Sequence, residues 1–262
     1  MDPAAFIALA AELGCSHVTL TLGPAANRLP PNPPLVLHDN PALQRAVSAA
    51  LTDHRITLGV LEGLALSPEI AAETHAPALD CAARLGAKAV CAIGLHRDPA
   101  RGHAEFAQLA QMAAARGLDL VTELGAGALR RIDKAQAALT AVDAPNFKLL
   151  IDTMHFFRFG GTLDQMAALA PGAIGHVQLC DAPMPAQIAD YMTEALYERR
   201  APGDGDLPLA EFLRLVPPGV VVGLEVPIRS QAEAGVPTRD RLARCVTAAR
   251  GIMADAWGRA EN

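Results

Sequence analysis

Four consecutive apolar segments of the sequence end in side chains that could carry acid–base or metal chemistry. "LVTELG" ends at Glu123, "LLIDTMH" turns polar at Asp152, "HVQLCD" carries His176, Gln178 and Asp181, and "VVGLEVP" ends at Glu225. Neighbouring parallel strands of a barrel bring their carboxyl ends to one edge. Three carboxylates that converge there repel one another unless a cation neutralises them or one of them stays protonated.

Oxygen-rich ligation of this kind suits a hard divalent cation. The sequence therefore predicts a site for Mn²⁺ or Mg²⁺, with Co²⁺ or Zn²⁺ as alternatives if a histidine joins the ligands. Each residue also has a structural interpretation. A single acid at a strand end is often only solvated, Asp152 could cap a helix or a turn, and Asp181 could anchor the loop that follows it.

The elements that would position these residues form a repeated pattern. Alanine-rich amphipathic segments such as "AEFAQLAQMAAARG" alternate with compact apolar segments such as "LDLVTELG". This alternation predicts helices around a parallel sheet that is buried on both faces. Seven such units favour an α/β fold of the (β/α)₈ TIM-barrel type, and no Gly-x-Gly-x-x-Gly or Walker loop supports a nucleotide-binding sheet.

The count is one strand short of eight, because the chain opens on a helix where a complete barrel would place its first strand. We expect a single domain over residues 1–262 that lacks this strand, and an exposed sheet edge that a homodimer could cover.

Composition excludes several classes of protein. The 262 residues are 51% hydrophobic and carry a net charge of −6, which disfavours a nucleic-acid surface. The apolar segments are too short to span a membrane, and no basic leader precedes them, so we expect a cytoplasmic protein. Five separate cysteines without a C-x-x-C pair predict buried thiols and no disulfide framework.

The motifs "ELG", "LLIDTMH", "HVQLCD", "RRAPGDGDLPL" and "GLEVP", in this order, resemble the xylose-isomerase-like TIM-barrel superfamily. The best match is to its sugar phosphate isomerase and epimerase branches. Family members often read His-x-His on the third motif; this chain reads "HVQ", as in the hydroxypyruvate-isomerase-like branch. The resemblance implies that four residues hold the metal: Glu123, Asp152, Gln178 and Glu225. It also implies that Glu123 and Glu225 act as the acid–base pair.

Four further residues are candidates for substrate binding. His155 completes the family's Asp-x-x-His, although a structural role beside two phenylalanines is an alternative interpretation. Arg200 precedes the Pro-Gly loop, where the resemblance implies that a basic side chain binds a substrate oxyanion or phosphate. His176 lies two residues before Gln178 on the same strand face, and His96 lies at the end of its own strand.

These residues predict a divalent-metal-dependent isomerase or epimerase of a small sugar or α-hydroxy ketone, in carbohydrate metabolism. A carboxylate would move a proton through an enediolate that the metal stabilises. The alternatives are a dehydratase of a keto-cyclitol or dehydroshikimate-like ring, and a degenerate barrel without catalysis. Apurinic-site endonucleases share the superfamily, but they need a basic groove that an acidic chain does not supply.

Overall fold

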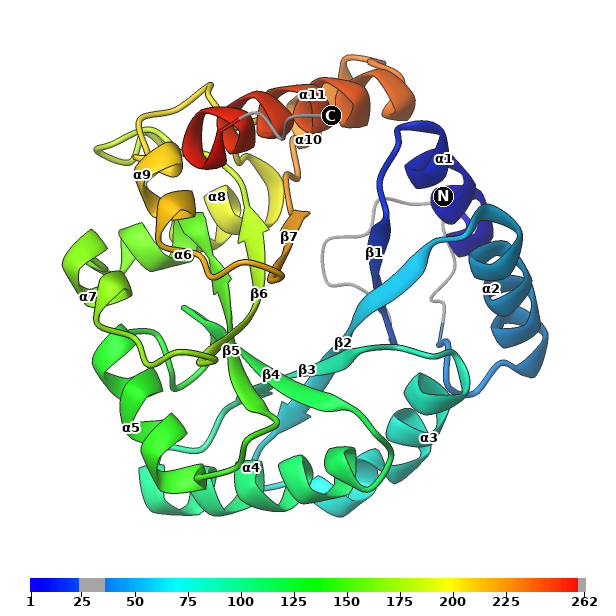
Figure 1. The fold of residues 1–262 in the computed structure, drawn as a ribbon, viewed down its shortest axis with the longest axis vertical. Coiled ribbons are helices and arrows are strands. Elements are labelled where there is room, and N and C mark those ends of the chain that lie inside the picture. Colours follow the sequence, from blue (N-terminus) through cyan, green and yellow to red (C-terminus); the bar gives the residue numbers. More distant parts are fainter. Residues whose placement is uncertain (24–35, 259–262) are drawn as a thin grey trace. The chain divides into compact units, whose positions relative to one another are not determined.

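The computed structural model describes residues 1–23 and 36–258, in which helices and strands alternate along the chain (Figure 1). The strands are β1 (His17–Thr21), β2 (Thr57–Leu66), β3 (Ala89–Gly94), β4 (Asp119–Leu124), β5 (Phe147–Asp152), β6 (Ile174–Leu179) and β7 (Val221–Leu224). The first helices are α1 (Pro3–Glu12), α2 (Pro41–His54), the 3₁₀ helix η1 (Ala72–His75), α3 (Ala76–Arg84), α4 (Pro99–Ala114) and α5 (Ile132–Val142). The later helices are α6 (Thr153–Arg158), α7 (Leu163–Ala167), α8 (Tyr191–Tyr197), α9 (Leu209–Arg214), α10 (Arg229–Glu233) and α11 (Thr238–Trp257).

The strands follow one another in the sheet in the order of the sequence, β1 to β7. The pairs β1–β2, β2–β3, β3–β4 and β6–β7 are parallel. Within the described residues the sheet has seven strands, and α1 comes before β1, so the predicted seven helix–strand units are confirmed.

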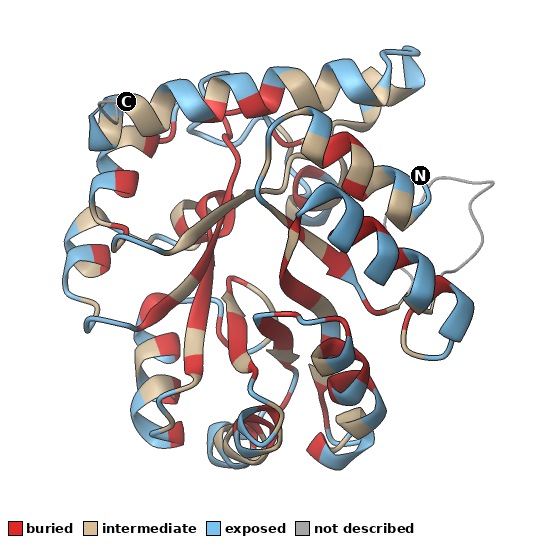
Figure 2. Cartoon of the chain, turned by 45° about the vertical axis from the view of Figure 1, so that its right-hand side comes forward, coloured by how far each residue is buried: buried red, intermediate tan, exposed pale blue. Residues whose placement is uncertain are grey.

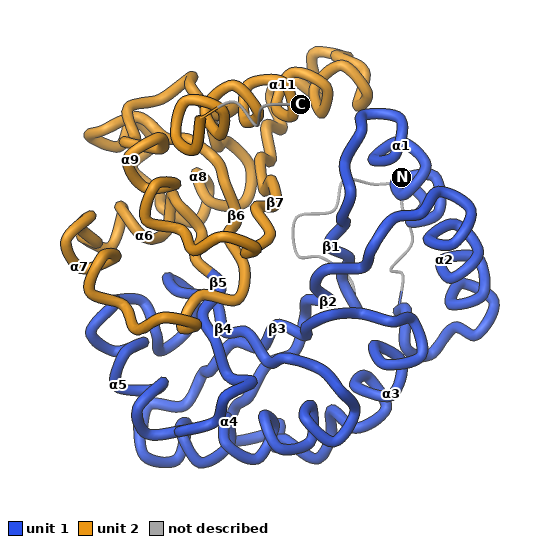
Figure 3. Tube along the Cα trace, in the orientation of Figure 1, with its two compact units in different colours: residues 1–150 blue, residues 151–262 orange. Residues whose placement is uncertain are grey.

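The chain divides into two compact units, residues 1–150 and residues 151–262 (Figure 3). The boundary falls inside β5, after Leu150. The first unit contains β1 to β4 and most of β5. The second contains the end of β5, strands β6 and β7, and helices α6 to α11. The prediction of one domain over the whole chain stays a prediction.

Several helices begin where a capping residue stands directly before a proline. Asp2 accepts hydrogen bonds from the backbone N–H groups of α1, Asn40 does so for α2, and Asp98 for α4; a proline follows each of them. The side chain satisfies donors that the first turn leaves open, and proline, which lacks an N–H, is already set to the helical φ. These pairs fix where the helices start.

Strands β2 to β5 are buried at most positions, which Figure 2 shows as largely red ribbons, whereas β1 alternates between buried and more exposed residues. On β3, Val90 and Ala92 belong to the large cluster that includes the helices, whereas Ala89 and Cys91 belong to a separate small cluster. The small cluster consists of Val60, Ala89, Cys91, Val121 and Leu150. Side chains of a strand alternate between its faces, so this small cluster is the interior face predicted from the apolar segments.

In the second unit, aromatic rings hold α6 against α9. The rings of Phe156 and Phe212 have centroids 5.8 Å apart, and Phe157 lies edge-on to Phe212. Phe156 and Phe212 are both buried. Helix α6, which begins directly after β5, is therefore fixed from its outer side.

Candidate active site

The polar turn at the end of β5 is the start of a helix. The strand ends at Asp152, and α6 begins at Thr153, so the segment predicted as the end of a strand becomes helical there. Asp152 is fully buried, and its Oδ1 accepts a hydrogen bond of 2.9 Å from the backbone N–H of His155. Asp152 is thus the N-cap of α6, and this bond uses only one of its two oxygens.

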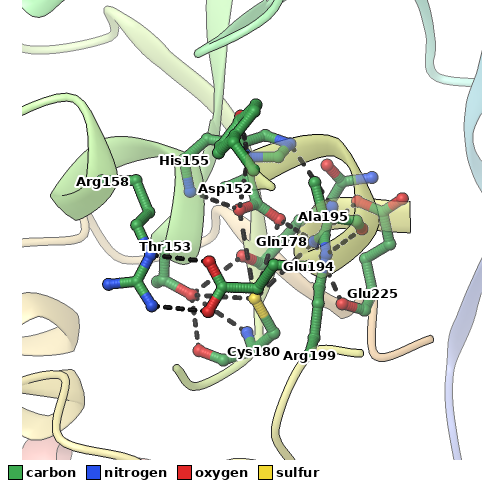
Figure 4. Close-up of polar contacts among 11 residues, drawn as sticks. Asp152, Thr153, His155, Arg158, Gln178, Cys180, Glu194, Ala195, Arg199 and Glu225 are labelled. Atoms are coloured by element: carbon green, nitrogen blue, oxygen red, sulfur yellow. Dashed lines mark hydrogen bonds and ion pairs between the residues drawn. The ribbon is translucent and has the colours of Figure 1, made fainter. Parts of the chain in front are cut away.

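The other oxygen of Asp152 pairs with a residue that the sequence did not single out. Arg199 Nη1 lies 2.5 Å from Asp152 Oδ2 and 3.1 Å from Glu225 Oε2. The Arg199 side chain is 3% exposed, whereas that of Glu225 is 38% exposed. Figure 4 shows the guanidinium among the side chains of Asp152, Gln178 and Glu225. One nitrogen thus serves two carboxylates that stand at the ends of β5 and β7.

The chain directs Arg199 into this place through its backbone. Asp181 and Arg200 form an isolated antiparallel bridge, and the N–H of Arg199 donates to the carbonyl of Pro227. Arg199 Nε donates to the carbonyl of Ala195 at 2.8 Å, at the end of α8. Successive side chains in extended backbone point to opposite sides, so Arg199 is buried while Arg200 is exposed and bonds to Gln187. The structure therefore does not bring Arg200 into the cluster.

His155 lies between this cluster and α8. Arg199 Nη2 is 3.3 Å from His155 Nε2, and the Tyr191 hydroxyl is 2.7 Å from His155 Nδ1. A guanidinium can only donate, so Nε2 is the acceptor in this contact and Nδ1–H donates to Tyr191. His155 is 7% exposed. The predicted substrate-binding histidine is therefore held in the site by two side chains, Tyr191 and Arg199.

Strand β6 supplies Gln178 and His176 next to β7. Both are buried, and Gln178 is paired in register with Gly223 while His176 is paired with Val221. A Cβ on Gly223 would come 2.9 Å from His176 Nε2, so this position leaves room for the imidazole only as glycine. Gln178 thus follows Asp152 and precedes Glu225 in the series of strand ends, as predicted for a ligand. The ligand roles themselves stay predictions.

Cys180 and Thr153 join the start of α6 to the end of β6. Thr153 Oγ1 lies 2.7 Å from the carbonyl of Cys180, and it accepts from the Cys180 N–H at 3.0 Å. The thiol lies 3.9 Å from Asp152 Oδ2 and 3.6 Å from Arg199 Nη1. Burial raises the pKa of the Cys180 thiol to about 12; the charge of Asp152 adds to the rise and that of Arg199 opposes it. This thiol is a neutral packing group.

A second buried ion pair attaches α8 to α6. Arg158 donates to Glu194 through Nε, at 2.8 Å, and through Nη2, at 2.6 Å. Their side chains are 9% and 2% exposed. Arg158 Nη2 also donates to the carbonyl of Pro183 at 2.7 Å. A bidentate pair of this kind fixes geometry as well as charge.

Asp181 organises the loop that carries the Pro-Gly motif. Its carboxylate accepts from the N–H groups of Ala182, Gly203 and Leu207, at 2.8, 2.9 and 3.1 Å. A Cβ on Gly205 would collide with Asp181 Oδ1 and with the backbone of Ala182. The interpretation of Asp181 as a loop anchor is therefore correct, and the motif "PGDGDLP" is explained by this packing.

Two of the predicted site residues belong to the first unit. Glu123 is half-buried near the end of β4, two residues after Val121 of the interior cluster. Asp152 likewise comes two residues after Leu150 of that cluster, so each acid follows an inward-facing residue at the same spacing. His96 is buried after β3, beside Gly102 of α4. The predicted roles of Glu123 and His96 stay predictions.

The donor types fit a hard divalent cation. Asp152, Gln178 and Glu225 supply carboxylate and amide oxygens from the ends of three successive strands. However, within residues 1–23 and 36–258, no group of three or more His, Cys, Asp or Glu side chains is arranged so that it could hold a metal ion. The positive charge beside Asp152 and Glu225 comes from Arg199. These residues thus offer oxygen donors of the right type, and Arg199 is the cation that the structure places against them.

Comparison with known proteins identifies the family. The model of the xylose isomerase-like TIM barrel family matches residues 7–244. The chain belongs to this family. Its α/β TIM-barrel fold class, predicted from the helix–strand repeat and the strand-end motifs, is thereby confirmed. No curated protein matches the sequence.

Solved structures of this fold superpose on nearly the whole chain. An IOLI protein with a binding zinc atom has a TM-score of 0.78 at 16% identity, over 96% of this chain and 92% of its own. D-psicose 3-epimerase from Clostridium cellulolyticum H10, solved with D-tagatose, has a TM-score of 0.71 at 16% identity, over 97% and 94%. The probable 3-DHS dehydratase AsbF from Bacillus anthracis has a TM-score of 0.71 at 15% identity, over 94% and 92%. At these identities the likeness concerns the fold.

Proposed function

We propose that this family member is an isomerase or epimerase that transfers a proton on a small sugar or α-hydroxy ketone with the help of a divalent cation. The observation that supports the proposal most directly is the arrangement around Arg199. A buried carboxylate at the end of β5 and a half-exposed one after β7 lie within reach of the same nitrogen, with His155 beside them.

Glu225 is the residue best suited to move the proton. Its carboxylate is 38% exposed, so a substrate can approach it, whereas Asp152 is fully buried. A carboxylate that substrate can reach is able to accept a proton from the carbon next to a carbonyl. Glu123 is the proposed second member of the acid–base pair, on the strength of the sequence motif.

Asp152, Gln178, Glu225 and Glu123 are the residues proposed to hold the cation. When bound, a divalent cation would polarise the substrate carbonyl and stabilise negative charge on its oxygen. Arg199 is placed to donate hydrogen bonds to substrate oxygens, and His155, whose Nδ1–H donates to Tyr191, can accept a hydrogen bond from a substrate hydroxyl through Nε2. Mn²⁺ and Mg²⁺ are the proposed ions, with Co²⁺ and Zn²⁺ as alternatives.

The fate of the proton defines the reaction. Its return to the neighbouring carbon gives isomerisation, and its return to the opposite face of the same carbon gives epimerisation. Loss of a β-hydroxyl from the same intermediate would give dehydration instead. All three reactions need the same first step, the removal of a proton next to a carbonyl.

The test is therefore an exchange experiment in D₂O. Metal-stripped protein is loaded with Mn²⁺, Mg²⁺, Co²⁺ or Zn²⁺ in turn and incubated with a panel of ketoses and small hydroxy ketones. We expect deuterium at the carbon next to the carbonyl, and a product of unchanged composition apart from that label. A product lighter by one water would identify a dehydratase. Absence of both deuterium and product over the whole panel would contradict the proposal.

A pair of variants links the activity to the site. Glu225→Gln should lower the exchange rate by roughly 10²- to 10⁴-fold, because it removes the proton acceptor while keeping the shape of the side chain. Glu211→Gln, on the exposed face of α9, is the matched control and should exchange at the parental rate.

A further inference from the structure

We propose that Arg199 and a divalent cation are alternative partners of the Asp152 and Glu225 carboxylates. In the metal-free protein Arg199 supplies the positive charge, and binding of the ion requires its guanidinium to leave. The inference extends the cation binding in the proposed function to a residue that the sequence motifs did not assign.

The first argument is steric. Arg199 Nη1 is 2.5 Å from Asp152 Oδ2 and 3.1 Å from Glu225 Oε2. A Mg²⁺ ion binds carboxylate oxygens at about 2.1 Å, so an ion held by these two oxygens would occupy nearly the same space as that nitrogen. A cation and Nη1 cannot both be there.

The second argument is electrostatic. Asp152 is fully buried, and the structure places a guanidinium against it where a metal enzyme would place an ion. Burying a carboxylate without a compensating charge destabilises the folded state. A cation in contact with the carboxylate therefore stabilises the protein when no metal is bound. A divalent ion and a guanidinium in direct contact would in turn repel one another.

The third argument concerns how Arg199 can move. Its backbone N–H is held by the carbonyl of Pro227, and its Nε by the carbonyl of Ala195. The guanidinium end contacts the side chains of Asp152, Glu225 and His155, and also the thiol of Cys180 and the carbonyl of Glu225. Rotation of the side chain alone can therefore release the carboxylates while the backbone stays in place.

Competition between Arg199 and the cation predicts that removing this site residue strengthens metal binding. Arg199→Met keeps the apolar stem and removes the charge, so metal-stripped Arg199→Met should melt at a lower temperature than the parent in EDTA. The same variant should bind Mn²⁺ at least about tenfold more tightly, because the ion no longer displaces a competitor. Saturating Mn²⁺ should also raise its melting temperature more than it raises that of the parent.

The measurements are Mn²⁺ titration by calorimetry and thermal unfolding of the full chain, with and without the ion. Arg244→Met, which removes an exposed arginine paired with Asp204, is the control and should leave Mn²⁺ affinity unchanged. If Arg199→Met fails to fold, Arg199→Gln keeps a hydrogen-bond donor for the carboxylates but removes the charge. It should still bind Mn²⁺ more tightly than the parent.

Unchanged or weaker Mn²⁺ binding in the Arg199 variants would overturn the inference. Absence of Mn²⁺ binding in the parent and in all variants would overturn it as well. Neither result decides the proposed function, which the deuterium exchange tests separately with and without EDTA. Tight Mn²⁺ binding without exchange on any substrate would leave the competition standing and contradict the activity.

Discussion

At the scale of single residues, the helix-cap interpretation of Asp152 uses one carboxylate oxygen and leaves the second for another partner. Its Oδ1 caps α6 through the N–H of His155, and its Oδ2 pairs with Arg199. The cap fixes the carboxylate plane, so the second oxygen points in a set direction. Preorganisation of a site residue by a backbone bond is a recurring feature of metal and catalytic sites.

Cys180 gives a prediction about reactivity. Burial raises the pKa of its thiol to about 12, so in the folded protein it stays protonated at pH 8 and should not react with a thiol reagent. Because the unfolded thiol ionises near its ordinary pKa of 9.0, this contribution to stability is complete below pH 9 and is lost as the pH rises toward 12.

The measurement is the number of thiols that react with a disulfide reagent at pH 8. Cys180→Ala should leave the number unchanged in the native protein and lower it by one in guanidinium chloride. Cys15, which is only partly buried, should react before the four buried cysteines. A native protein that loses one reactive thiol on this substitution would show that Cys180 is accessible.

Arg199 is a site residue that the sequence analysis missed. The strand-end acids are readable because an apolar run that turns polar marks the place where a strand leaves the core. Arg199 and Arg200 stand side by side, and nothing in their types says which one turns inward. The choice depends on the bridge between Asp181 and Arg200, a contact between segments 19 residues apart. The local cue is only that a basic pair precedes the Pro-Gly motif.

At the scale of elements, α8 and the residues that follow it bring side chains to the site from a connection between two strands. Tyr191 contacts His155, Glu194 pairs with Arg158, and Arg199 follows the helix end. Asp190 caps the helix, and its hydrogen bonds from Thr193 hold its carboxyl pKa below the ordinary value. This helix is hard to predict from the sequence, since it is short and its contacts are distant in sequence.

The ion pair between Arg158 and Glu194 should be a main support of α8. Glu194→Gln leaves the buried Arg158 without its carboxylate, and removing one partner of a buried pair costs about 3–5 kcal/mol. Urea unfolding should show a loss of that order, while Glu211→Gln on the exposed face of α9 should change stability little. The double variant Arg158→Met/Glu194→Met should lose less than the sum of its single variants. Simple additivity would contradict a coupled pair.

The loop over residues 201–208 should depend strongly on the carboxylate of Asp181. Asp181→Ala removes the acceptor for three backbone N–H groups, so the amides of Ala182, Gly203 and Leu207 should exchange with D₂O faster. Asp204→Ala, whose carboxylate contacts the exposed Arg244, is the matched control and should leave these amides protected. Equal exchange in the two variants would show that the loop is held by other contacts.

The strands themselves were predictable because their residues are buried on both faces, which leaves long apolar runs that no other element produces. β3 and β5 are buried at all but one position. Strand β5 ends at Asp152, the residue at which the apolar segment turns polar. There the capping preference of Asp152 prevails over the continuing apolar pattern, since Met154 and Phe156 are buried as residues of α6 instead.

At the scale of the whole molecule, the overall charge affects which partners the protein can bind. The sequence carries 22 basic and 28 acidic side chains. Exposed basic residues also stand beside acids, as in Arg131 with Asp133, Arg239 with Asp240 and Arg244 with Asp204. No helix in the part of the chain that the structure describes is long and apolar enough to cross a membrane. The predicted cytoplasmic location and homodimer stay predictions, and light scattering after size exclusion tests the second.

This charge pattern makes nucleic acid an unfavourable partner, although apurinic-site endonucleases share the superfamily. Binding to a duplex gains most of its free energy from released counterions, and that requires clustered Lys and Arg not already paired with acids. We expect no mobility shift of a duplex with an abasic site at about 10 µM protein and physiological salt, conditions under which basic proteins bind even non-specifically. Lowering the salt should not produce binding either, because a net charge of −6 repels phosphate more strongly when screening is weaker. A salt-dependent shift at these concentrations would mean that a basic surface outweighs the overall charge. It would also count against the proposal that the substrate is a small hydroxy ketone.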